Sequence, residues 1–240
     1  LLRWWWRTMH AGFVDVPTLR AMEAAVWGDT NAGGAVRVTV ERAGQWRPQL
    51  YDKRLKASMN DEAKKSEHGI PGCEPRKTTQ GLWYASFGMD DESKDRRTGQ
   101  KVRKQRWFVP PGAKWTVRLT ARDGFYLRPD HKKDEKPVRV GADTILGQAK
   151  AALWLLCHFG GVGSKGRKGF GSFADLAPDG VATLDDCKRK AAEFREARGL
   201  GSSSRIADSP ALDNMLPVVQ VPTEWRDPWH ALDQVGFAAQ

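Results

Sequence analysis

Five glycines and three cations alternate between residues 161 and 171, and this stretch is the strongest candidate in the chain for chemistry. Glycine tolerates positive φ and lets a ligand approach the backbone closely. Successive backbone N–H groups in such a loop can cradle an anion, and the cations add an attraction for phosphate that salt screens. The pattern therefore predicts a phosphate-binding loop, with a plain turn and solvated cations as the alternative. The residues concerned are Gly161, Gly163, Ser164, Lys165, Gly166, Arg167, Lys168, Gly169 and Gly171.

The elements on either side of this loop should hold it in place, and their order excludes two nucleotide-binding motifs. Apolar residues recur at spacings of three and four over 145–160, which predicts a buried helix capped by Asp143 or Thr144. Two phenylalanines flank a short strand-like piece after the loop. The dinucleotide fingerprint G-x-G-x-x-G needs a strand before the loop and a helix after it. A P-loop is excluded because no G-K-[ST] closes the loop.

A second group of cations lies on a helix predicted over residues 1–10. Arg3 and Arg7 are one helical turn apart, and like charges at this spacing repel each other unless an anion lies between them. The pair therefore indicates a phosphate site, with His10 beside it at the end of the helix. We expect these side chains to line the same groove as the loop, with Arg37 at its border on a strand predicted over 35–41.

Local signals predict most of the remaining elements. Pro17 suits a first helical turn and Gly28 a helix end, while Thr183, followed by two aspartates, is a typical cap. A Pro-Pro-Gly turn indicates a hairpin whose outer face is a ladder of Thr and Arg. We predict helices over 16–27 and 183–199, strands over 35–41 and 81–89, and the hairpin over 107–123, with charged or polar loops over 44–80 and 90–105 and a Ser/Pro-rich linker over 202–220.

The composition favours a polyanionic partner and a cytoplasmic location. The net charge is +10, and some of the eleven tryptophans could stack on bases. Three widely spaced cysteines without a C-x-x-C pair disfavour a disulfide framework or a zinc site and fit a reducing compartment. No apolar run reaches the roughly 18 residues of a membrane span. We therefore expect no cofactor, no metal and no membrane partner.

Several motifs in order resemble one protein family. The helix LRWWWR ending in H-A-G, a helix ending in E-x-x-x-W-G, a valine strand and the later FGGVGSKGRKGFGS loop resemble the RAMP superfamily, the RNA-binding subunits of CRISPR effector complexes. The family of first subunits of Cmr, or type III-B, complexes is the most similar. The likeness covers residues 1 to about 176 and continues weakly over 224–240. The strand that the family places before its WWR helix is missing.

This resemblance implies an α+β, ferredoxin-like (RRM-type) domain over 1–180, with insertions at 44–80 and 90–105 and without its first strand. Residues 181–223 would be a helix and linker, and 224–240 the start of a truncated second domain. Family members hold guide RNA and target RNA beside other RAMP subunits and read shape and phosphates. The resemblance therefore implies a non-enzymatic RNA-binding scaffold subunit in antiviral defence. The implied RNA contacts are Arg3, Arg7, His10, Arg37 and residues 161, 163–168.

Two other functions stay open at this point. Some RAMP proteins are metal-independent endoribonucleases, and this chemistry needs a general acid or base within reach of a 2′-OH. His10 is the only histidine near the motifs that resemble the family, and no paired partner for it is evident. The third possibility is a non-catalytic protein-interaction subunit, in which the tryptophans serve subunit contacts.

Overall fold

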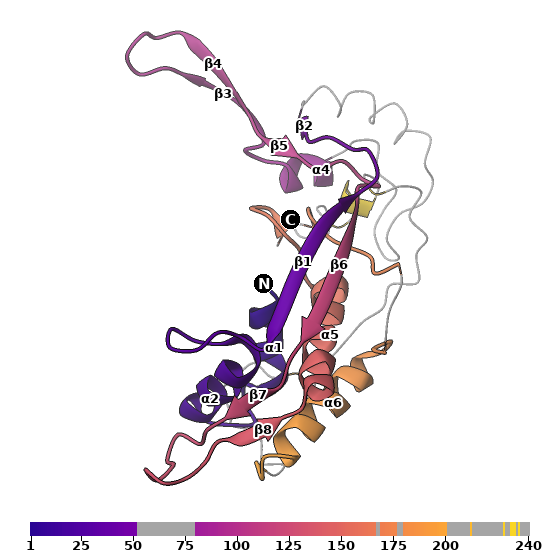
Figure 1. Cartoon of the computed structure of the whole chain (residues 1–240). Helices are drawn as coiled ribbons and strands as arrows, with labels where there is room; N and C mark the ends of the chain where they lie inside the picture. Colours follow the sequence, from indigo (N-terminus) through magenta and orange to yellow (C-terminus); the bar gives the residue numbers. More distant parts are fainter. Residues whose placement is uncertain are drawn as a thin grey trace. The chain divides into compact units, whose positions relative to one another are not determined.

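The structure is a computed structural model, and it describes residues 1–51, 80–166, 169–176 and 180–200, with 212, 228, 231–233 and 235. The predictions for most of 44–80, for the linker 202–220 and for most of 224–240 lie outside these residues. The helices are α1 (Leu2–His10), α2 (Val16–Trp27), α4 (Gln80–Ala85), α5 (Ala142–Phe159) and α6 (Leu184–Glu196) (Figure 1). The strands are β1 (Val36–Ala43), β2 (Gln49–Leu50), β3 (Asp90–Lys94), β4 (Lys101–Gln105), β5 (Trp107–Phe108), β6 (Lys114–Ala121), β7 (Gly124–Tyr126) and β8 (Val138–Val140).

The chain forms two compact units that interleave along the sequence. The first comprises Leu1–Glu41, Thr116–Gly160 and Phe173–Val218, and the second comprises Arg42–Trp115, Gly161–Ser172 and Val219–Gln240. The glycine-rich loop therefore belongs to the second unit, whereas α1 belongs to the first. The strands form two-stranded sheets, so the fold is mixed α/β, in line with the predicted class. The ferredoxin-like arrangement, the missing strand and the domain boundaries stay predictions.

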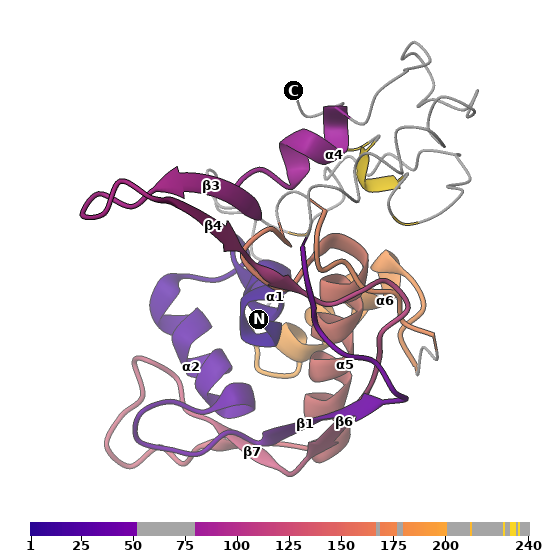
Figure 2. The same ribbon diagram turned by 90° about the horizontal axis from the view of Figure 1, so that it is seen from above.

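Helices build the core of the first unit. α5 packs against both α1 and α6, and α2 packs against β7 (Figure 2). Trp6, Met22, Ile145, Leu155 and Phe194 have no exposed surface, so each of the four helices contributes to one apolar cluster. Burial of this apolar surface is the main force that holds the unit together.

Local side chains cap the starts of α2 and α6 but not that of α5. α2 has the predicted bounds, and the Asp15 carboxylate accepts a hydrogen bond from the Thr18 N–H at 2.8 Å. Thr183 forms a capping box at the start of α6. The predicted cap of α5 is wrong, because this helix starts at Ala142, whose N–H donates to Asp123 at 2.9 Å. The capping carboxylate comes from a residue 19 positions away, so no local pattern could identify it.

Strand β1 confirms the predicted valine strand, but the apolar face of the strand is covered only at its start. β1 lies beside β6, and the two form one sheet (Figure 1). Val38 is 40% exposed, Val40 59% and Val117 39%, whereas Val36, at the start of β1, packs against the apolar core. The Thr/Arg ladder of β6 is exposed, as predicted.

Three predictions for residues 81–123 are wrong. The apolar run 81–89 forms the short helix α4 and a turn; the adjacent residues Ala85 and Ser86 are both buried, which does not fit the alternation of a half-buried strand. The charged loop 90–105 is the antiparallel hairpin β3–β4, in which an Arg103–Asp90 ion pair joins the strands at 2.6 Å. The hairpin over 107–123 does not form, because β5 pairs with β2 while β6 pairs with β1.

Aromatic side chains fix the glycine-rich loop in the second unit. Phe170 packs against Ala85 and Leu232, and its ring centroid lies 6.4 Å from that of Tyr51. Residues 169–171 form a turn, so the strand-like piece predicted after the loop is wrong. Within the described part of the chain, no helix is both long and apolar enough to cross a membrane.

Candidate nucleic-acid interface

The glycine-rich loop has a defined backbone shape. Val162 donates its N–H to the Gly171 carbonyl at 3.0 Å, and Gly166 donates to Gly163 at 3.3 Å. Gly171 has φ +72°, and a Cβ there would lie 2.0 Å from the Val162 oxygen. A Cβ on Gly161 would lie 3.2 Å from the Gly166 Cα. These contacts close the loop on itself, and only glycine fits at the crossing.

The tip of the loop presents backbone to solvent. Gly163 and Ser164 are exposed, and the space around Gly163 is open. Among the residues that the structure describes, neither of their N–H groups donates a hydrogen bond. Within the described residues these two successive amides have no partner, and the phosphate-binding role of the loop stays a prediction.

Of the three loop cations, the structure describes the contacts of one. The Lys165 ammonium donates to the Phe87 carbonyl, in the turn after α4, and its side chain is partly buried. Lys165 therefore ties the loop to the body of the second unit. Arg167 and Lys168 lie outside the described residues.

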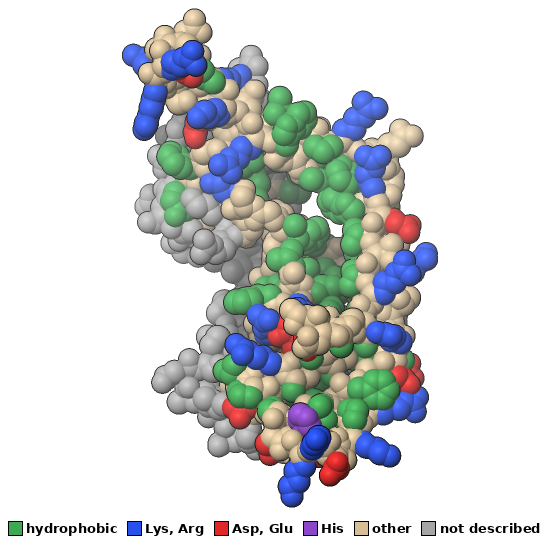
Figure 3. Space-filling model, turned by 60° about the vertical axis from the view of Figure 1, so that its left-hand side comes forward, with side chains coloured by type: hydrophobic (Ala, Val, Ile, Leu, Met, Phe, Trp, Pro, Cys, Tyr) green, Lys and Arg blue, Asp and Glu red, His purple; other side chains and the backbone are tan. Residues whose placement is uncertain are grey.

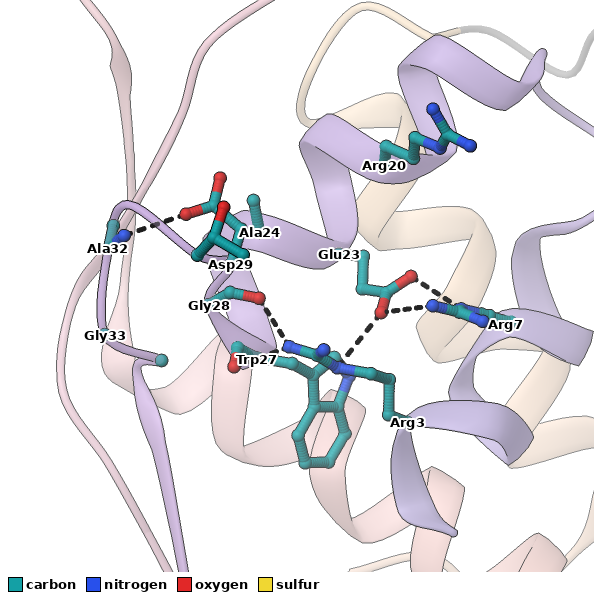
Figure 4. A pocket seen from close by; sticks show the side chains of 12 residues that line it. Arg3, Arg7, Arg20, Glu23, Ala24, Trp27, Gly28, Asp29, Ala32 and Gly33 are labelled. Atoms are coloured by element: carbon teal, nitrogen blue, oxygen red, sulfur yellow. Dashed lines mark hydrogen bonds and ion pairs between the residues drawn. The ribbon is translucent and has the colours of Figure 1, made fainter.

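The anion between Arg3 and Arg7 is a carboxylate of the protein itself. Glu23, on α2, lies 3.0 Å from the Arg3 Nε and 2.6 Å from the Arg7 Nε (Figure 4). Its side chain is only 8% exposed, whereas those of the two arginines are 43% and 42% exposed. The hydrogen bond with Glu23 also raises the pKa of Arg7. The spacing of the arginines thus correctly indicated an anion, but the anion is internal.

An open pocket of about 600 Å³ adjoins this ion pair in the first unit. Arg3 closes one side by donating to the Trp27 carbonyl at 2.9 Å and to that of Gly28, at the end of α2. Arg20 also lines the pocket but is directed away from the Glu23 carboxylate (Figure 4). The exposed parts of these guanidinium groups give the pocket a cationic wall.

His10 lies in the core and not on the arginine face. It has no exposed surface, and its Nε2 lies 2.9 Å from the Gln148 Oε1. Because the Gln148 nitrogen donates to the Lys190 carbonyl at 2.8 Å, its oxygen faces the ring, and His10 Nε2 carries the proton. His10 Nδ1 then faces the Arg195 guanidinium at 3.4 Å. The structure therefore removes His10 from the predicted RNA contacts.

Burial also fixes the charge of this histidine. Desolvation lowers the pKa of His10 to about 3; the hydrogen bond to Gln148 opposes this shift, and the charges of Arg195 and Arg198 add to it. The ring is neutral at physiological pH. It can neither bind phosphate as a cation nor reach a ribose as a catalyst.

The first unit carries further exposed cations on its sheet. Arg37 is exposed on β1, and Arg118 is exposed on β6. Arg122, after β6, donates to the Gly33 carbonyl at 3.3 Å. Since the loop belongs to the other unit, a single groove that joins it to Arg3, Arg7 and Arg37 stays a prediction.

Sequence reasoning missed two residues that organise these sites. Glu23 is the only carboxylate in α2, and it stands among buried apolar residues. A single acid in an otherwise apolar helix, after a helix with an arginine pair, could have indicated this ion pair. Phe87, whose carbonyl receives Lys165, lies in a run assigned to a strand, and nothing in its local pattern indicates the contact.

A model of the RAMP superfamily matches residues 1–174. The chain belongs to the RAMP superfamily. Among known RAMP relatives, the CRISPR system Cmr subunit Cmr1-2 of Pyrococcus furiosus is 23% identical over 180 residues, which are 72% of this chain and 76% of that protein.

A solved structure shows the same fold. The apo crystal structure of Cmr1 from Pyrococcus furiosus matches 99% of this chain with a TM-score of 0.54 and 18% identity. The match covers 61% of that protein, so this RAMP chain spans about three fifths of its length.

We predict that His10 makes stability depend on pH. Its folded pKa lies below the ordinary value of 6.5, so the unfolded chain binds the proton first and stability falls as the pH drops from 6.5 toward 3. In urea titrations, His10→Gln should flatten this dependence by up to about 1.4 kcal/mol per pH unit relative to the wild type. His131→Gln, at an exposed histidine, is the matched control. Parallel curves for wild type and His10→Gln would contradict a buried neutral ring.

Proposed function

We propose that this RAMP protein is an RNA-binding scaffold subunit of a type III-B (Cmr) CRISPR effector, acting in antiviral defence in the cytoplasm. The glycine-rich loop holds phosphates of the guide RNA and target RNA. The observation that carries the proposal is the loop tip, where a closed backbone presents the Gly163 and Ser164 amides beside a run of cations. Backbone recognition suits a protein that must accept any guide sequence.

The loop residues divide into a support and a contact surface. Lys165 fixes the loop on the Phe87 carbonyl, and the glycines set its shape. Gly163, Ser164, Arg167 and Lys168 then contact phosphate. For the last two residues the proposal rests on the sequence alone.

Assembly with other RAMP subunits is part of this proposal. The named relatives are a Cmr subunit and a Cmr1 crystal structure, which supports membership in the same kind of complex. Basic side chains are exposed in both units: Lys and Arg gather on the β3–β4 hairpin, at the top of Figure 3, and Lys114 and Arg118 are exposed on β6. The endoribonuclease alternative loses its proposed base, because His10 is buried.

A non-catalytic protein-interaction subunit is the second candidate. The exposed Val38, Val40 and Val117 on β1 and β6 favour it, since an uncovered apolar sheet face suits a partner surface. Purification from its host with and without RNase separates the two functions. We expect RNA to co-elute without RNase; partners that remain while no RNA co-elutes would support the second candidate instead.

Reversing the loop charges should weaken RNA binding and its salt dependence. We expect Lys165→Glu, Arg167→Glu and Lys168→Glu together to reduce the slope of log affinity against log salt by about 1.4 for single-stranded RNA, because the phosphate contacts of Arg167 and Lys168 no longer release counterions. The measurement is a filter-binding titration at several salt concentrations.

A control with the same change in net charge isolates the loop. Lys132, Lys133 and Lys136 are exposed between β7 and β8, in the first unit. Their triple reversal to Glu should change the slope less. An equal change for both triples would mean that total charge, and not the loop, binds RNA.

The loop shape should matter independently of its charge. Gly171→Ala places a Cβ against the Val162 carbonyl and leaves the net charge unchanged, so we expect RNA affinity to fall by about tenfold. Gly112→Ala is the control, because Gly112 has a similar φ of +82° but open space around it. Wild-type affinity in Gly171→Ala would show that a defined loop backbone is not needed.

A further inference from the structure

Phe87 lies in a hydrogen-bonded turn and presents its ring to solvent. Its side chain is 66% exposed, although Ala85, Ser86 and Met89 around it are at most 4% exposed. Phe87 donates its N–H to the Tyr84 carbonyl at 3.3 Å, and Met89 donates to Ser86 at 3.0 Å. Both sides of the turn are therefore anchored in the second unit, which fixes the backbone from which the ring projects.

This turn is joined directly to the glycine-rich loop. The Lys165 ammonium donates to the carbonyl of Phe87 itself, and a Cβ on Gly88 would lie 4.0 Å from the same nitrogen. Both segments belong to the same unit. An exposed aromatic residue alone needs no explanation, but this one is pre-positioned at the base of the phosphate-binding candidate.

We infer that the Phe87 ring is a stacking platform for an unpaired RNA base of the strand whose phosphates the loop holds. This inference rests on the function proposed above. Proteins bind single-stranded RNA by combining cations along the backbone with aromatic rings under the bases, and every base offers a π-face. Because the backbone of the turn is already fixed, this contact costs little further backbone entropy.

A stacking platform of this kind needs RNA with unpaired bases. A base within a continuous duplex is stacked on both sides and cannot lie on a protein ring, whereas an unpaired base can. Phe87 should therefore contribute to binding of single-stranded RNA and contribute nothing to binding of a blunt duplex. Stacking also releases no counterions, so its contribution should not vary with salt.

The test compares Phe87→Ala with Phe87→Tyr in the full chain, with a 30-nucleotide single-stranded RNA and its blunt duplex as probes. We expect Phe87→Ala to weaken single-strand binding roughly 5- to 150-fold with an unchanged salt slope, and Phe87→Tyr to retain it. Phe125→Ala is the matched control, since this ring is 61% exposed on β7 of the first unit. Its affinity should stay at the wild-type value.

The outcomes separate this inference from the proposed function. If the loop charge reversal weakens binding while Phe87→Ala does not, the loop proposal stands and the stacking site is overturned. An equal loss in Phe125→Ala, or an equal loss for the duplex, also overturns it. If neither the loop variant nor Phe87→Ala weakens binding, both proposals fail.

Discussion

A single buried side-chain amide, that of Gln148, aligns three helices in the first unit. Its oxygen accepts hydrogen bonds from Trp6 and His10 of α1, and its nitrogen donates to a main-chain carbonyl of α6. A buried polar group without a partner costs about 1–3 kcal/mol. The amide therefore favours the orientation of α1 about its axis in which the oxygen and the nitrogen of Gln148 both have hydrogen-bond partners. In that orientation Arg3 and Arg7 lie on the side of α1 that meets α2. The cationic face therefore depends on a neutral hydrogen-bond network in the core.

The same helix shows why charge alone does not identify a ligand. Two arginines one turn apart require an anion, and Glu23 of α2 supplies it from a nearly buried position. An acid in that position is stabilised by two guanidinium groups, and they in turn lose part of their capacity for phosphate. An anion in the pocket beside them would have to use the guanidinium N–H groups that are not already bonded to Glu23 or to the carbonyls at the end of α2. The loop in the second unit carries the stronger case, because its exposed amides have no such internal partner among the described residues.

Local signals predicted the parts of the fold that local chemistry controls. The bounds of α2 and the Thr183 cap follow from residues within one helical turn. The β3–β4 hairpin was missed because charged residues occupy both of its faces and leave no apolar alternation to detect. Its stability comes instead from cross-strand pairing and from Asp95, whose carboxylate accepts two backbone N–H groups at 2.8 Å in the connecting turn. The partner of β5 was missed for another reason: it lies far away in the sequence, before residues outside the described part of the chain.

In the candidate site, too, local sequence predicted the local feature and missed the long-range contact. The glycine spacing predicted an anion-binding loop, and the close crossing at Gly171 explains why these positions must be glycine. What the pattern could not reveal is the support beneath it, because the Lys165–Phe87 contact joins residues 78 positions apart. That contact places the loop next to the exposed ring of Phe87. A loop of amides and cations alone would bind any polyanion with a salt-dependent affinity. The stacking site inferred for the exposed Phe87 ring adds a contribution to affinity that salt does not screen and that only a nucleic acid with unpaired bases can use. Neither contribution depends on base identity, which suits the scaffold function proposed above.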